Sequence, residues 1–141
     1  MKTENLNWTL LFTSWTVTAI SMLGSLFFSQ VMEYAPCELG WYQRIALFPL
    51  VLILAIGLFP FDRSVLKFAA PLAAIGWLFA AYHNLLYYGV ISRELSPCSQ
   101  GVSCTERYVT LIGIFSIPLL SLISFSVITL LLLILIKRTH K

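Results

Sequence analysis

YVTLIGIFSIPLLSLISFSVITLLLLILI, residues Tyr108–Ile136, runs for 29 residues without a charged side chain. An α-helix rises about 1.5 Å per residue, so about 20 apolar residues cross the hydrocarbon core of a bilayer. The run is therefore long enough to predict a membrane-spanning helix.

Three further runs also lack charged residues: Asn5–Met32, Ile45–Phe61 and Phe68–Ser92. Only 11% of the chain is charged and 59% is hydrophobic, whereas a soluble domain has about 25% charged residues. We therefore predict one all-α domain over 1–141, an integral membrane four-helix bundle. Its helices are expected at about 8–32, 41–60, 66–90 and 104–136. The first run is too long for the apolar region of a signal peptide, so we expect it to be retained.

Lysine and arginine are unevenly distributed between the segments that flank these runs. If both termini lie on one side, that side carries six of them and the other carries Arg44, Arg93 and Arg107. Positive residues collect on the cytoplasmic side of membrane proteins. We therefore place both termini in the cytoplasm. The net charge of +3 follows from this bias and does not indicate nucleic-acid binding.

The cysteines all fall in the two predicted outer loops, Cys37 in the first loop and Cys98 and Cys104 in the second. Disulfides persist on the outer side of the membrane, so this placement favours thiol–disulfide chemistry. A disulfide between Cys98 and Cys104 would close a small exposed loop, and such a bridge is readily reduced by a dithiol. The alternative interpretation, in which the same bridge is a static staple of the loop, stays open.

The sequence Ser103-Cys104-Thr105-Glu106 matches the S-x-x-E capping box that begins helices. It predicts that the fourth helix starts here, with Cys104 at its first position. The positive end of a helix dipole lowers the pKa of a thiol, and the thiolate is the form that attacks disulfides.

The first loop contains PCELGWYQR, residues Pro36–Arg44. It resembles the first-loop motif P-C-x-L-C-x-Y-[EQ]-R of the disulfide bond formation protein B (DsbB) family, at six of its seven specified positions. The resemblance extends to the four helices, to cysteines in both outer loops and to His83 near the outer end of the third helix. The short spacing from Cys98 to Cys104 is similar to the compact, BdbC-like members from Gram-positive bacteria.

This resemblance implies a quinone-dependent protein disulfide oxidoreductase in the bacterial cytoplasmic membrane. It would reoxidise an extracytoplasmic thioredoxin-like thiol oxidase and pass electrons to a quinone, with menaquinone favoured over ubiquinone and no metal. Cys98 would form the mixed disulfide with the partner, and Cys104 would pass electrons to Cys37. Arg44 would lie beside the quinone head group, with His83 as a second candidate. The alternative role of Arg44 is that of an interfacial anchor, and the alternative role of His83 is an interhelical hydrogen bond.

Gly40 departs from the motif, because the family has its quinone-proximal cysteine at this position. If the second helix starts near Gly40, this position shares a helix face with Arg44. Without a thiol here Cys37 has no partner in its own loop, so we expect electron transfer to quinone to be blocked or very slow. A deliberate cysteine-to-glycine substitution that arrests an intermediate is our hypothesis, and a natural paralogue is the alternative. The sequence allows either a Cys37–Cys104 or a Cys98–Cys104 disulfide.

Two other function classes remain. A small multidrug-type transporter needs an ionisable residue in mid-membrane for ion coupling, and only His83 lies inside a predicted span. A non-enzymatic membrane protein with a structural loop disulfide is the second alternative. We expect Glu38 and Gln43 to be solvated or interfacial.

Overall fold

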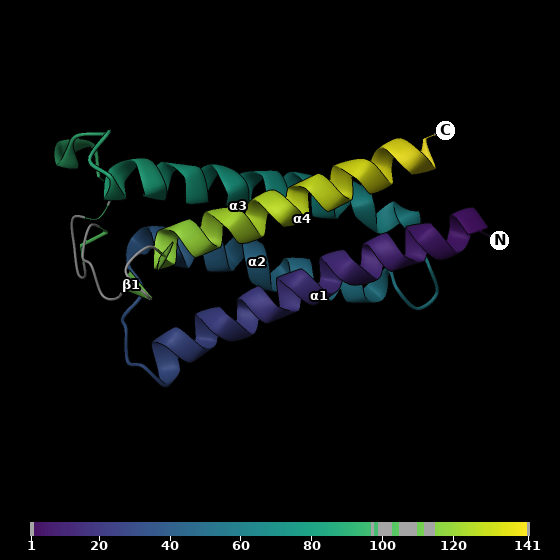
Figure 1. Ribbon diagram of the computed structural model, residues 1–141, viewed down its shortest axis with the longest axis horizontal. Helices are drawn as coiled ribbons and strands as arrows, with labels where there is room; N and C mark the ends of the chain where they lie inside the picture. The colour runs from purple at the N-terminus through teal and green to yellow at the C-terminus, as the bar shows by residue number, and fades with distance from the viewer. Residues whose placement is uncertain (1, 97, 99–102, 105–109, 112–114, 141) are drawn as a thin grey trace.

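Four long helices dominate the computed structural model of this chain (Figure 1), which describes residues 2–96, 98, 103–104, 110–111 and 115–140. They are α1 (Lys2–Gln30), α2 (Glu38–Ile56), α3 (Leu66–Tyr87) and α4 (Ile117–Thr139). The short elements are the 3₁₀ turns η1 (Arg63–Val65) and η2 (Arg93–Leu95) and the strands β1 (Thr110–Leu111) and β2 (Phe115–Ser116). The two strands pair antiparallel, with Thr110 opposite Ser116.

The four helices are long and apolar enough to cross a membrane. Their outer faces expose large apolar side chains, such as Leu23 on α1, Leu52 on α2, Leu78 on α3 and Leu130 on α4. An apolar exterior is what a lipid environment requires. The predicted all-α membrane bundle is confirmed, and the chain is a multi-pass membrane protein.

The helices form a closed ring in which α1 packs on α2, α2 on α3, α3 on α4 and α4 on α1. Both termini lie at one end of the bundle, and the connections that carry the cysteines lie at the other end (Figure 1). An even number of spans requires the termini to share a side, as the sequence predicted. All three cysteines therefore gather at one end of the molecule.

Small residues on α3 let α4 approach closely. Ala69, Ala73, Gly76 and Ala80 follow helical spacing, and the three alanines are completely buried. Membrane helices associate through such small-residue faces because their backbones can then pack at short range. The ring of Phe125 on α4 fills the space above Gly76, where an added Cβ would lie 2.1 Å from its Cε1 atom.

We expect Gly76→Ala to destabilise the bundle by about 1–3 kcal/mol, because the new methyl group overlaps the Phe125 ring. Thermal unfolding in detergent should show a lower Tm. Gly24→Ala on α1 is the matched control, since its added Cβ meets no atom within 4 Å and alanine favours helix over glycine. Equal Tm values for the two variants would contradict the close packing of Phe125 on Gly76.

The predicted start of the fourth helix is wrong. Cys104 lies in a turn, and α4 begins at Ile117, thirteen residues later. Ser116 is the N-cap, with its side chain accepting a hydrogen bond from the Leu119 N–H at 3.4 Å, and Pro118 occupies the first turn. Proline is favoured there because it lacks an N–H and its φ is already helical. Cys104 therefore does not lie in the first turn of α4, and Thr105 and Glu106 of the predicted capping box lie outside the described residues.

Candidate functional site

The three cysteines form one cluster at the loop end of the bundle. Cys98 and Cys104 form a disulfide with a Cα–Cα distance of 6.2 Å, and Cys37 is a free thiol. The three Sγ atoms all lie within 4.8 Å of one another. Leu39 and Leu86 pack around the cluster and help to bury Cys104. The structure thus contains the second of the two pairings that the sequence left open.

Cys37 immediately precedes α2 and is partly buried. Burial raises the pKa of its thiol above the ordinary value, the backbone amides of Gly40 and Leu39 lower it in part, and the charge of Glu38 raises it. The thiol is therefore mostly protonated at neutral pH. Since exchange needs the thiolate, this burial lowers the reactivity of Cys37 toward the neighbouring Cys98–Cys104 disulfide.

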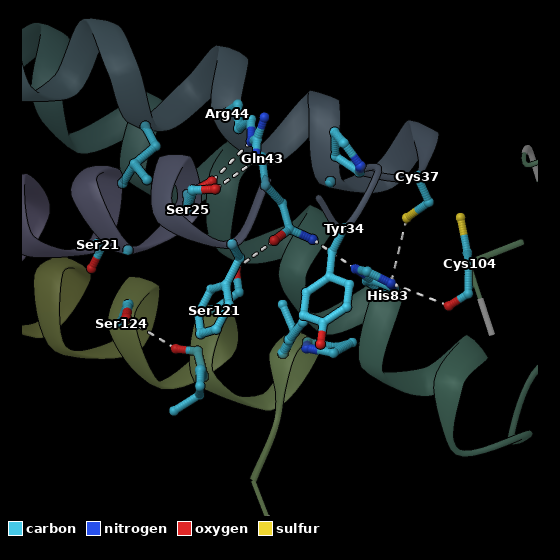
Figure 2. Close-up of a pocket in the computed structure, with 18 of the residues that line it drawn as sticks. Ser21, Ser25, Tyr34, Cys37, Gln43, Arg44, His83, Cys104, Ser121 and Ser124 are labelled. Atoms are coloured by element: carbon cyan, nitrogen blue, oxygen red, sulfur yellow. Dashed lines mark hydrogen bonds between the residues drawn. The ribbon is translucent and has the colours of Figure 1, made fainter. Parts of the chain in front are cut away.

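His83 connects the cysteine cluster to the interior of the bundle (Figure 2). Its Nε2 atom lies 3.3 Å from the carbonyl oxygen of Cys104 and 3.7 Å from Sγ of Cys37. Its Nδ1 atom lies 3.1 Å from Nε2 of Gln43, and the Ser121 hydroxyl donates to Oε1 of Gln43. An amide nitrogen can only donate, so Nδ1 is the acceptor and the imidazole proton resides on Nε2. His83 therefore presents an N–H to Cys104 and Cys37.

Arg44 is a cation held inside the helix bundle, with 9% of its surface exposed. Its Nε donates to Ser25 Oγ at 2.8 Å, and its Nη2 donates to the Ser25 carbonyl at 2.7 Å. The guanidinium carbon also lies 5.4 Å from the centre of the Trp41 ring. The two bonds use two of the five N–H donors of the guanidinium. No ion pair to Arg44 occurs among the residues that the structure describes.

A cavity of about 340 Å³ connects the cysteine cluster with Arg44. Its polar lining includes Ser25, Gln43, Arg44, His83 and Ser121, and its apolar lining includes Ile20, Phe28, Leu47, Leu120 and Phe125. Small-molecule sites are commonly 300–1,000 Å³ and mostly apolar, with a few polar groups that orient the ligand. This cavity therefore has the size and lining of a site for a small, mostly apolar molecule with hydrogen-bond acceptors.

Gly40 lines this cavity on the first turn of α2, one helical turn before Arg44. A Cβ atom added here would lie 3.5 Å from Cβ of Pro36 and 3.9 Å from Sγ of Cys37, which are ordinary contact distances. The position therefore has room for a small side chain directly beside the Cys37 thiol. Gly40 and Arg44 share a helix face, as the spacing predicted.

Five of the six predicted site residues line the one cavity: Cys37, Gly40, Arg44, His83 and Cys104. Cys98 joins them through its disulfide. Gln43 was predicted to be solvated or interfacial, which is wrong, because it is buried between His83 and Ser121. Its position three residues after Gly40 could have placed it on the cavity face. Ser25 and Ser121 were not predicted, since isolated serines in apolar runs carry no such signal.

The membrane-spanning helices form a ring that holds a disulfide and a free thiol beside one cavity. This arrangement defines the class of membrane proteins that carry out thiol–disulfide exchange. The family model for "Disulfide bond formation protein DsbB" matches residues 7–135. The chain belongs to the DsbB family.

Curated relatives agree with this assignment. The chain is 43% identical over 137 residues to a "Probable disulfide formation protein" of Metapseudomonas resinovorans, covering 96% of this chain and 95% of that protein. It is 44% identical over 115 residues to "Disulfide bond formation protein C" of Bacillus subtilis (strain 168), covering 82% and 83%. No solved structure gives a significant match.

Proposed function

We propose that the Cys98–Cys104 disulfide oxidises the dithiol of an extracytoplasmic thioredoxin-like thiol oxidase. The observation that carries this proposal is the position of the disulfide beside the Cys37 thiol, with all three sulfurs within 4.8 Å. Cys98 is half-buried whereas Cys104 is buried, so Cys98 is the sulfur that a soluble partner reaches. The uneven distribution of lysine and arginine supports an outer position for this end of the bundle.

The exchange proceeds in two displacements that conserve electrons. A partner thiolate attacks Cys98 and forms a mixed disulfide, while Cys104 leaves as a thiolate and gains a proton. The second partner thiolate then displaces Cys98, so the partner gains a disulfide and the chain gains two thiols. The Nε2–H of His83 donates to the main-chain carbonyl of Cys104. This hydrogen bond holds Cys104 at the cavity when its sulfur leaves the disulfide.

We further propose that the cavity holds the head group of a membrane quinone, with menaquinone favoured by the resemblance to compact Gram-positive members. Arg44 offers N–H donors that Ser25 leaves unused, and a quinone carbonyl is an acceptor that needs such donors. The apolar walls suit the ring. A bound quinone would supply a two-electron acceptor at the cavity.

Gly40 limits what this chain does with the electrons. The quinone-proximal thiol implied by the motif is replaced by a hydrogen atom, so Cys37 has no partner in its own loop. Two electrons received from a partner therefore remain on Cys98 and Cys104. We propose that the chain acts as a one-equivalent oxidant, which means that each chain oxidises one partner dithiol and stops before quinone reduction.

Titration with a reduced thioredoxin-like dithiol under anaerobic conditions tests this function. We expect about one partner disulfide per chain, followed by no further reaction with or without menaquinone. Cys37→Ser should keep this single equivalent because Cys37 lies outside the disulfide. The double variant Cys37→Ser, Cys98→Ser retains one cysteine and should yield none. A disulfide that stays oxidised in excess dithiol would show a structural staple instead.

A further inference from the structure

Three sulfur atoms and one imidazole nitrogen converge at the loop end of the bundle. The Sγ atoms of Cys37, Cys98 and Cys104 lie within 4.8 Å of one another, and Nε2 of His83 lies 3.7 Å from Sγ of Cys37. We propose that reduction of the Cys98–Cys104 disulfide turns these four side chains into a binding site for Zn²⁺. This proposal stands apart from the oxidase function, because it needs only the reduced chain and the metal.

The spacing of Cys37 and His83 is close to that of two ligands in a tetrahedral Cys₃His zinc site. Zinc bonds of about 2.3 Å to sulfur and about 2.0 Å to nitrogen place neighbouring sulfurs ~3.8 Å apart and a sulfur and nitrogen ~3.5 Å apart. Cys37 Sγ and His83 Nε2 are already at 3.7 Å. Once reduced, Cys98 and Cys104 have to separate from bonding distance, and their side chains have to turn toward Nε2 of His83 to reach the same spacing. The loop between them is short, but its two ends already lie at the site.

The surroundings of His83 suit a metal ligand. Metal-bound histidines usually donate their second ring N–H to a polar group, which fixes the ring orientation. Nδ1 of His83 already faces the Gln43 amide at 3.1 Å. When Nε2 binds the metal its proton moves to Nδ1, and the Gln43 amide turns so that its oxygen accepts. Ser121, which now donates to that oxygen, can accept from the amide nitrogen because a hydroxyl does both.

The reaction balances with a dithiol as the reductant. The dithiol gives two electrons and two protons to the Cys98–Cys104 bond and becomes a disulfide. Binding of Zn²⁺ to the three thiols then releases three protons, because zinc coordinates thiolates. While zinc is bound, the sulfurs are not free to reform a disulfide. Zinc would thus hold the chain in its reduced state.

Metal analysis of the purified chain tests the site. The chain is prepared once oxidised and once reduced, incubated with Zn²⁺ and passed through a desalting column. We expect about one zinc per reduced chain and none in the oxidised chain, whose disulfide removes two ligands. Both samples share one sequence, and equal circular-dichroism spectra before zinc is added exclude a failure to fold as the cause of this difference. Equal zinc contents in the two samples would overturn the proposal.

Variants of the reduced chain assign the ligands. Cys37→Ser and His83→Gln should each weaken zinc binding by at least about 10–100-fold, the loss that even an outer partner of a ligand causes. His140→Gln is the matched control, because His140 is the other histidine of the chain and ends α4 at the opposite end of the bundle. Unchanged zinc affinity in both ligand variants, or a loss in the His140→Gln control, would overturn the assignment.

Discussion

Gly40→Cys is expected to convert the chain from a one-equivalent oxidant into one that turns over with menaquinone. The backbone at this position accepts a side chain, since an added Cβ meets Pro36 and Cys37 at ordinary contact distances. The new thiol would lie at the start of α2, where the helix dipole favours thiolate. It would give Cys37 a partner in its own loop, so that electrons can leave Cys98 and Cys104.

The measurement is the number of partner disulfides formed per chain in the presence of a soluble menaquinone analogue. Even a slow enzymatic rate of about 1 s⁻¹ would yield dozens of disulfides within a minute, compared with about one for the unaltered chain. Gly40→Ser is the matched control, because it fills the same space without a thiol and should stop at one. A folded Gly40→Cys chain that also stops at one would refute the proposed block at this position.

After treatment with oxidised glutathione as the two-electron oxidant, Cys98→Ser is expected to contain an interloop disulfide between Cys37 and Cys104 in most molecules. The substitution leaves Cys104 without its present partner, while the Cys37 sulfur lies within 4.8 Å. A disulfide needs about 2.05 Å between sulfurs, so a shift of less than about 3 Å suffices. Cys104 lies in a turn outside the long helices and can supply this movement.

Mass mapping under non-reducing conditions, after alkylation of free thiols, detects the new bridge as a crosslink between the two loops. Cys37→Ser should keep the Cys98–Cys104 bridge and show no crosslink between the loops. Full alkylation of both remaining cysteines in oxidised Cys98→Ser would mean that the two loops do not exchange electrons. That outcome would remove the path from the partner to Cys37.

The sequence was sufficient to predict the membrane-spanning helices, because charge-free runs of membrane-crossing length have few alternative structures. It failed at the start of α4, where two capping signals compete. The box at Ser103–Glu106 is a local pattern, whereas Ser116 is followed by Pro118, which is compatible with the first turn of a helix and disfavoured further inside. The second signal determines where the helix begins, so Pro118 lies in the first turn of α4 and not in the interior that the predicted 104–136 helix implies.

The site was predictable where one helix carries it and unpredictable where several helices meet. Gly40 and Arg44 share a face of α2 by spacing alone. The contact from Arg44 to Ser25 joins the consecutive helices α1 and α2, and that from Gln43 to Ser121 joins α2 to the distant α4. Both contacts depend on how the ring of helices closes. Polarity alone suggested that Gln43 is exposed, whereas buried polar groups are accommodated wherever a partner exists.

The ring of Phe125 takes part in two structures at once. It fills the space over Gly76 between α3 and α4, and it also lines the cavity. A smaller side chain at this position would deepen the cavity and, by the same change, loosen the contact between the two helices. The size of molecule that this bundle can accept is therefore coupled to its resistance to unfolding, and selection for a bulkier ligand would act against stability.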